Sequence, residues 1–191
     1  MASPGVYAKG VAKREEILRA ALRVFERDGN AGTTMRAVAK EAGLSLAGLT
    51  HYFPSRDLLL TEVLFTVDRE FEALYYERPD TGPGEFLARA MERNQADPVR
   101  VWLYLTMLAA TRDPEHPAAP FFRDRFERFR TVVAQHVRDQ QARGEVPAHV
   151  DPDFAARSLL AAADGIQNVW LHDRTIDMGA HIRTTWRLLI G

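Results

Sequence analysis

The chain has 191 residues and a formal charge of -1 at pH 7, because its 25 Lys and Arg side chains are balanced by 26 Asp and Glu. A hydrophobic content of 46% supplies a buried core, and a near-neutral charge excludes a polycation that coats nucleic acid or lipid through its whole surface. The absence of cysteine excludes disulfides, thiol catalysis and cysteine-ligated metal sites.

The start of the chain predicts no targeting or membrane segment. Residues 1–10 are small and polar and lack the apolar stretch of a signal peptide. The most apolar run, residues 99–110, contains Arg100 and is far shorter than the roughly 20 residues that span a bilayer. We therefore expect a soluble, cytoplasmic protein that makes no membrane contact.

Apolar residues recur with a helical period along the whole chain. Ile17, Ala21 and Val24 form such a stripe, and Pro- and Gly-rich breaks at 78–84, 113–120 and 144–152 separate the later segments. No segment alternates as a strand does. The pattern predicts an all-α fold with about nine helices, at residues 11–28, 35–42, 46–52, 56–77, 84–96, 99–112, 119–143, 152–173 and 176–190.

Charge is distributed unevenly between the two ends. Residues 1–57 carry nine basic and six acidic side chains, whereas residues 58–191 carry 16 basic and 20 acidic ones. The positive N-terminal part points toward an anionic partner.

The stretch from Thr33 to Phe53 has the spacing of a helix-turn-helix. Thr34 suits the N-cap of a short helix, and Gly43 suits the left-handed residue that ends it. Ser45 suits the cap of a second short helix, which Leu49 would anchor inward. Such a unit leaves one short helix free to enter the major groove of DNA.

A plain helical hairpin has the same small residues, glycine turn and serine cap, so the spacing alone leaves both interpretations open. The continuation favours DNA binding: His51 and Tyr52 come at the end of the second helix, Pro54 ends it, and Arg56 follows. Exposed polar and basic groups at a helix end are poor core material and suit phosphate contacts.

The segment from about Lys13 to Leu64 resembles the N-terminal DNA-binding domain of the TetR family of bacterial transcriptional regulators. The matching residues are Ile17, Ala20, Phe25, Gly29, Thr33, Thr34, Arg36, Ala39, Ala42, Gly43, Leu44, Ser45, Leu49 and the run from His51 to Arg56.

This resemblance implies a homodimer that binds a palindromic DNA operator, acts as a repressor, and is released by a small, largely apolar effector. It also implies a flexible tail at 1–10, a helix-turn-helix domain at 11–57, and a ligand-binding and dimerisation domain at 58–191. The DNA-binding residues that it implies are phosphate anchors and groove-facing residues: Thr33, Thr34, Arg36, Ser45, Leu46, Ala47, Thr50, His51, Tyr52 and Arg56.

The second short helix departs from the common family pattern. Many members have Lys where this chain has Leu46, Gly where it has Ala47, and Tyr where it has Thr50. Leu46 can make only apolar contacts in a groove. These differences leave the operator sequence open.

Bulky apolar residues dominate the remainder of the chain. Each fits an ordinary core, but aromatic residues with a few polar groups among them also line small-molecule pockets. The candidate effector residues are Met91, Trp102, Leu105, Phe122, Phe126, Gln167 and Trp170.

The last two predicted helices resemble the pair that forms the dimer in the family. Their stripe of Ile182, Trp186 and Leu189 suits packing against a two-fold mate, and burial within one subunit is the alternative.

No catalytic motif is present, and the six histidines never pair at a helical ligand spacing. We therefore expect neither an enzyme nor a bound cofactor or metal. The alternative to a regulator is a helical adaptor or small-molecule-binding protein without DNA binding.

Overall fold

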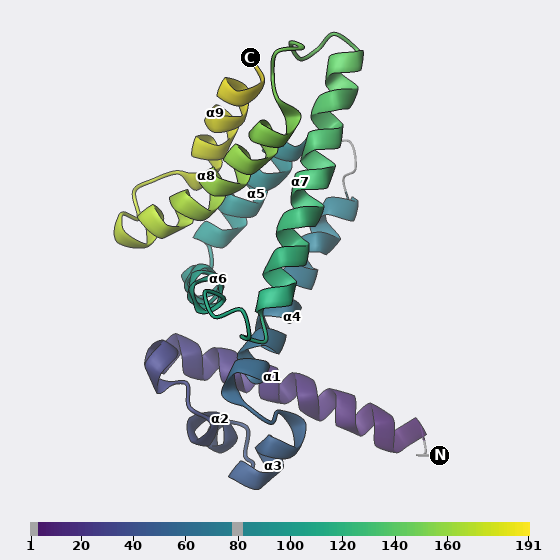
Figure 1. The fold of residues 1–191 in the computed structure, drawn as a ribbon. Coiled ribbons are helices and arrows are strands. Elements are labelled where there is room, and N and C mark those ends of the chain that lie inside the picture. Colours follow the sequence, from purple (N-terminus) through teal and green to yellow (C-terminus); the bar gives the residue numbers. More distant parts are fainter. Residues whose placement is uncertain (1–3, 78–81) are drawn as a thin grey trace. The chain divides into compact units, whose positions relative to one another are not determined.

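The computed structural model describes residues 4–77 and 82–191, with side chains over 9–69 and 82–191. Within these ranges the chain forms helices and no strand, which confirms the all-α prediction (Figure 1). The helices are α1 (Pro4–Gly32), α2 (Met35–Glu41), α3 (Leu46–Tyr52), α4 (Arg56–Glu77), α5 (Pro83–Gln95), α6 (Pro98–Ala110), α7 (Ala119–Ala142), α8 (Pro152–His172) and α9 (Met178–Ile190).

The first helix is longer than the sequence predicts at both ends. It begins at Pro4, so that residues 4–10, expected as a flexible tail, are helical. At its other end Gly29 has a φ of 71°, which kinks the chain before one more turn leads to Gly32. Residues 1–3 of the expected tail and most of the break at 78–84 lie outside the described residues.

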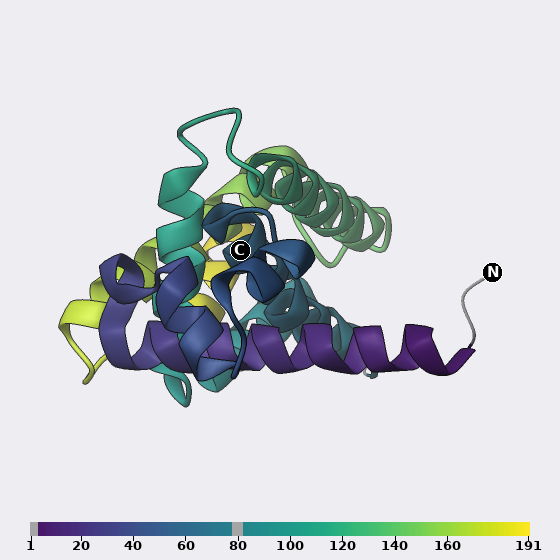
Figure 2. The ribbon, with the colours of Figure 1, turned by 90° about the horizontal axis from the view of Figure 1, so that it is seen from below.

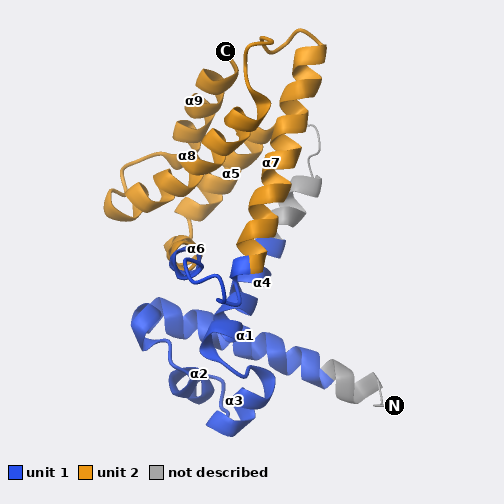
Figure 3. Cartoon of the chain, viewed as in Figure 1, with its two compact units in different colours: residues 1–69, 106–119 blue, residues 70–105, 120–191 orange. Residues whose placement is uncertain are grey.

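The chain packs as two units (Figure 3). Unit 1 comprises residues 1–69 together with 106–119, and unit 2 comprises residues 70–105 together with 120–191. The expected domain boundary after residue 57 therefore falls inside unit 1, and a segment far along the chain joins it.

The core of unit 1 lies between α1 and the shorter helices beside it, and Figure 2 shows α1 along its length. Ile17, Val24 and Phe25 on α1 are fully buried, as are Val38 on α2 and Leu49 on α3. The helical stripe that the sequence shows on the first segment is therefore buried in unit 1, where α1 packs against α2.

The core of unit 2 joins α5, α7, α8 and α9, and it includes Met91, Leu159 and Ile182. Helix α5 packs closely on α9, where a Cβ added to Gly84 would come within 2.3 Å of the Trp186 ring. Glycine is required there because it lets the indole lie against the α5 backbone.

The stripe on α9 is therefore an internal face. Ile182 is fully buried and Trp186 is 9% exposed within one copy of the chain. The interpretation of this stripe as a two-fold contact is wrong, because α5 already covers it.

Across the described residues, none of the helices has a stretch long and apolar enough for membrane passage.

Candidate nucleic-acid interface

Helix α2 begins and ends as its sequence predicts. The Thr34 hydroxyl oxygen accepts a hydrogen bond from the Ala37 amide at 3.2 Å and so caps the helix. At the other end Gly43 has a φ of 64°, and the Leu44 amide donates to the Ala39 carbonyl at 2.9 Å. This left-handed glycine turns the chain sharply from α2 toward α3.

Helix α3 is capped by Ser45, whose hydroxyl oxygen accepts from the Gly48 amide at 3.0 Å. Leu49 is fully buried and anchors the helix to the core of unit 1. The opposite face is exposed and carries the predicted groove-facing set of Ser45, Leu46, Ala47, Thr50 and His51. The structure thus brings these five residues together on one surface.

Two cationic side chains of α1 cap the C-terminal ends of the short helices. The Lys13 ammonium donates to the Ala42 carbonyl at 3.1 Å, at the end of α2. The Arg14 guanidinium donates to the Tyr52 carbonyl at 3.3 Å, at the end of α3, and lies 4.3 Å from the centre of the Phe53 ring. Cations are favourable at helix C-termini because the last carbonyls carry partial negative charge.

Helix α2 is also tied to α1 through Glu41. Its carboxylate accepts from Arg23 at 2.9 Å and from Arg27 at 3.1 Å. These two hydrogen bonds hold the pKa of Glu41 below its ordinary value. Sequence reasoning missed all four cations of α1 as positioning groups, because their partners are 14 to 38 residues away along the chain.

Two residues predicted to contact phosphate are instead engaged by hydrogen bonds within unit 1. Thr33 is fully buried, and its hydroxyl donates to the Gly29 carbonyl at 2.6 Å. Thr33 therefore cannot present its hydroxyl to a phosphate in this conformation.

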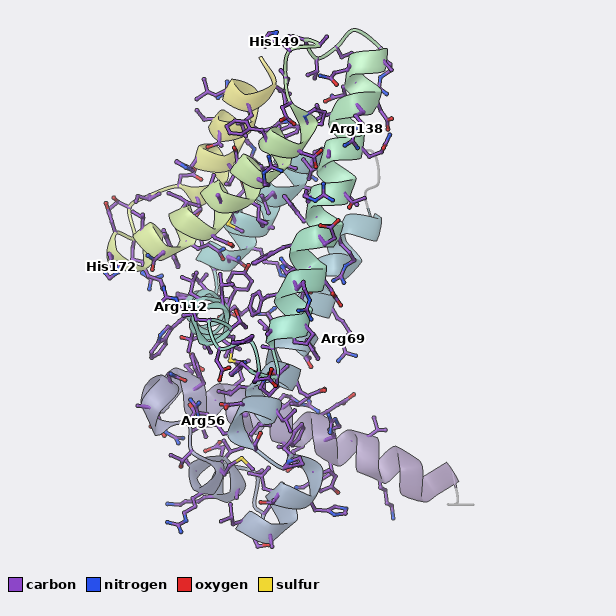
Figure 4. The ribbon with its side chains drawn as sticks, in the orientation of Figure 1. Arg56, Arg69, Arg112, Arg138, His149 and His172 are labelled. Atoms are coloured by element: carbon purple, nitrogen blue, oxygen red, sulfur yellow. The ribbon has the colours of Figure 1, made fainter. Side chains whose placement is uncertain are left out.

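Arg56, labelled in Figure 4, is likewise occupied. Its guanidinium donates to the Thr33 carbonyl at 2.7 Å and to the Asn30 carbonyl at 2.6 Å, and it also bonds the Asn30 side chain. The side chain thereby joins the start of α4 to the kinked end of α1.

The other predicted phosphate anchors lie at the surface. Thr34 and Arg36 are exposed, and Tyr52 is half-buried with its ring edge-on to His51 at 5.6 Å between centroids. In the part of the chain that the structure describes, neither Arg36 nor the exposed Lys40 forms an ion pair. Two cations of α2 are thus exposed within the helix-turn-helix.

The predicted effector residues all fall in unit 2, where they differ in burial. Met91 and Trp170 are buried in its core, and Leu105 packs against that core. Phe122 is buried beside Phe126, with 5.8 Å between ring centroids. Trp102 is 40% exposed, so it does not lie in the enclosed interior.

Gln167, the polar member of the effector set, is buried and paired. Its side-chain oxygen accepts from Asn94 on α5 at 2.9 Å, and its amide donates to the Ala163 carbonyl at 3.2 Å. The indole nitrogen of Trp170 is buried without a hydrogen-bond partner in the structure, and the Arg174 guanidinium lies 3.8 Å from the centre of a Trp170 ring.

A second polar pair joins α6 to α8. The Tyr104 hydroxyl donates to the Asp164 carboxylate at 3.0 Å, and Tyr104 also stacks edge-on against Phe122. Burial raises the pKa of both Tyr104 and Asp164. The signal in the sequence was an aspartate in the middle of an apolar helix, which periodicity alone does not explain.

Among the described residues, no cluster of three or more His, Asp or Glu side chains is arranged to hold a metal ion. His172, labelled in Figure 4, is the last residue of α8, and His149 precedes that helix in the chain.

Comparison with known proteins places this helix-turn-helix in a family. Residues 17–63 match the model of the bacterial regulatory proteins of the tetR family. Over 194 aligned residues the chain is 31% identical to the HTH-type transcriptional regulator BetI of Stenotrophomonas maltophilia, covering 96% of this chain and 93% of BetI. The chain belongs to the TetR family. It is a helix-turn-helix transcriptional regulator, and regulators of this family are not enzymes.

Solved structures of the TetR family have the same fold. NalD of Pseudomonas aeruginosa, described as a secondary repressor of a multidrug efflux pump, superposes with a TM-score of 0.75 at 22% identity, over 95% of this chain and 98% of NalD. EbrR, described as a multidrug-binding protein and solved with imidazole, gives a TM-score of 0.69 at 27% identity, over 94% of this chain and 90% of EbrR.

Proposed function

We propose that two copies of the chain bind a palindromic DNA operator, each placing α3 in the major groove, and thereby repress transcription. The observation that supports this proposal is the exposed face of α3, opposite the buried Leu49. A helix held by its caps and by one inward leucine is rigid enough for its outer side chains to distinguish base edges. Since the ligand is operator DNA, the protein acts in the cytoplasm by binding alone, without catalysis or a cofactor.

Contacts with phosphate come from the residues that flank this face. Arg36 is exposed and free of ion pairs within the described residues, and Thr34 and Tyr52 lie at the two ends of the motif. Phosphate contacts fix the register of a protein on the duplex, whereas groove contacts select the sequence. Arg56 acts indirectly, by holding the backbone around Asn30 and Thr33 in place.

Unit 2 forms the homodimer interface and the effector site, and unit 1 is the DNA-binding domain. Dimerisation uses outward side chains of α8 and α9, where Phe154 is 58% exposed, Val169 is 50% exposed and Leu188 is 81% exposed. Exposed apolar side chains of this size favour a protein–protein contact. A dimer is required because the two half-sites of an operator lie about 34 Å apart.

The effector is a small, largely apolar molecule bound among the aromatic residues of unit 2. Phe122, Phe126 and Tyr104 offer apolar surface, while Gln167 and Asp164 offer polar groups in the same unit. EbrR, a similar protein, is described as binding multiple drugs, which supports an effector site of this kind. The effector lowers operator affinity only as far as it prefers the DNA-free conformation.

A gel-shift titration tests this function. The purified chain is titrated onto the DNA upstream of its own gene and onto a scrambled duplex, at several salt concentrations. We expect tighter binding to the upstream DNA and a linear fall of log affinity with log salt concentration. Equal and salt-insensitive binding to both duplexes would favour the helical adaptor instead.

A further inference from the structure

The outward side chains of α3 begin with an apolar pair. Leu46 is 42% exposed, and Ala47 beside it is also exposed. Residues four apart lie on the same side of a helix, so Thr50 lies behind Leu46, and His51 lies behind Ala47. The first turn of this face therefore offers carbon atoms, and the polar groups come one turn later.

Each hydroxyl group on this face makes one hydrogen bond with the backbone. Thr50 donates its proton to the Leu46 carbonyl at 2.9 Å, and Ser45 accepts the Gly48 amide at 3.0 Å. The structure describes every residue of α3, and none is an Arg, Lys, Asn, Gln, Asp or Glu. Helix α3 thus lacks the side chains that make two hydrogen bonds with a single guanine or adenine.

We infer that α3 selects its half-site through the 5-methyl groups of thymine, with Leu46 as the main specificity-determining residue and Ala47 beside it. This inference rests on the proposed DNA binding. The thymine methyl is the apolar group that the major groove displays, and Leu46 and Ala47 are the apolar groups that α3 displays. An exposed leucine is ordinary on a protein surface. Leu46, however, is the first residue of α3 and lies on the exposed side of this helix, which Leu49 anchors.

Deoxyuridine substitution tests the inference directly. Duplexes bound by the full-length protein are selected from a random pool, and each thymine of the half-sites is then replaced by deoxyuridine. This change removes one methyl and leaves the base-pairing edge intact. We expect affinity to fall about fourfold for one methyl and about 15-fold when the matching methyl is removed from both half-sites.

Two leucine variants show whether Leu46 reads the methyl. At the position most sensitive to deoxyuridine, Leu46→Ala should bind the thymine and deoxyuridine duplexes with nearly equal affinity, because the main side chain that contacts that methyl is gone. Leu58→Ala is the matched control, since Leu58 is 39% exposed in the same unit but lies on α4. It should keep the full preference for thymine. Circular dichroism confirms that both variants retain their helices.

A third duplex separates methyl recognition from recognition of the thymine base. It carries 5-methylcytosine paired with guanine at the sensitive position, and cytosine in its own control. Recovery of part of the affinity by the added methyl supports the inference.

The outcomes distinguish this inference from the proposed function. If no duplex is enriched from the pool, DNA binding itself is wrong. If enriched duplexes bind specifically but tolerate deoxyuridine at every position, or if Leu46→Ala keeps the preference for thymine, the inference is overturned while the proposed function stands.

Discussion

Several polar side chains of the two units differ in what they hold together. In unit 1, Lys13, Arg14 and Arg56 end on main-chain carbonyls and hold helix ends in place. In unit 2, partly buried polar side chains pair with one another across helices, as in Asn94–Gln167 and Tyr104–Asp164. The bonds of unit 1 thus hold the ends of α2 and α3, whereas those of unit 2 join α5 and α6 to α8.

Substitutions in the two units should therefore have different consequences. A change inside unit 1 should alter the geometry of α3 and therefore DNA binding. A change inside unit 2 should alter stability, or the response to an effector, before it alters the intrinsic affinity for DNA. Substitutions in each unit test the contrast.

The largest effects are expected from the two buried leucines. Leu49 in unit 1 and Leu159 in unit 2 are both fully buried, and truncation of either to alanine should lower the free energy of unfolding by about 3 kcal/mol. Urea unfolding measures both. At a temperature where both variants remain folded, only Leu49→Ala should lose operator binding, because α3 loses its inward anchor. Equal loss of operator affinity in Leu159→Ala would break the contrast.

Substitutions of Arg56 and Arg36 should have smaller effects, and the two should differ in stability and in the salt dependence of DNA binding. Arg56→Ala leaves the Asn30 and Thr33 carbonyls without their donor and should cost about 2 kcal/mol of stability. Operator affinity should fall with it, but the dependence of affinity on salt should stay as in the wild type. Arg36→Ala, at an exposed position, should leave stability nearly unchanged and lower the salt slope by about one for each phosphate that the arginine no longer neutralises.

Arg56→Lys is the control for this pair, since it keeps the charge but cannot donate in the same fork-like geometry. It should restore only part of the stability. A salt slope that falls in Arg56→Ala as it does in Arg36→Ala would show that Arg56 contacts phosphate after all.

The helix-turn-helix could be predicted from the sequence because its determinants are local. Thr34, Gly43 and Ser45 each act on residues within a few positions, through a cap or a left-handed turn. Leu49 identifies the inward side of α3, and the exposed face follows from the helical period.

The roles of Thr33, Arg56 and the α9 stripe could not be predicted in the same way. Periodicity shows that a face is apolar but does not say which element covers it, and Trp186 packs on α5 only because Gly84 leaves room. Likewise, the sequence alone suggests that Arg56 is a surface cation, whereas the kink at Gly29 brings the Asn30 carbonyl within its reach.

Asp164 tests the buried polar groups of unit 2. Burial raises the pKa of its carboxyl, although the Tyr104 hydroxyl and the Arg125 cation partly oppose the shift. The stability that depends on the protonated carboxyl is therefore present below the ordinary pKa of 3.8 and is lost as the pH rises through the folded value. Asp164→Asn keeps an uncharged acceptor for Tyr104, so it should be at least as stable as the wild type at pH 7. Urea unfolding from pH 4 to 8 should show this advantage growing with pH, with operator affinity unchanged.

The smallest effects are expected from two carboxylates held by arginine pairs, one in each unit. In unit 2, Arg183 and Arg89 lower the pKa of Glu85 from 4.5 to about 2. Its contribution to stability is thus present above pH 4.5 and is lost as the pH falls toward 2. Glu85→Gln should cost less than about 1 kcal/mol at pH 7, because the carboxylate is more than a third exposed and solvent screens the pair.

Glu41→Gln in unit 1 removes the comparable carboxylate between α1 and α2, whose pKa is also lowered. Urea unfolding at several pH values should show the same direction of pH dependence for both variants, since both carboxylates are favoured in their ionised form. Operator affinity at pH 7 should separate them: Glu41→Gln loosens the helix that leads into α3 and lowers affinity, whereas Glu85→Gln leaves it unchanged. If the two variants lowered operator affinity equally, ion pairs to α1 would have no special part in positioning α3, and the contrast between the units would rest on the buried leucines and Arg56 alone.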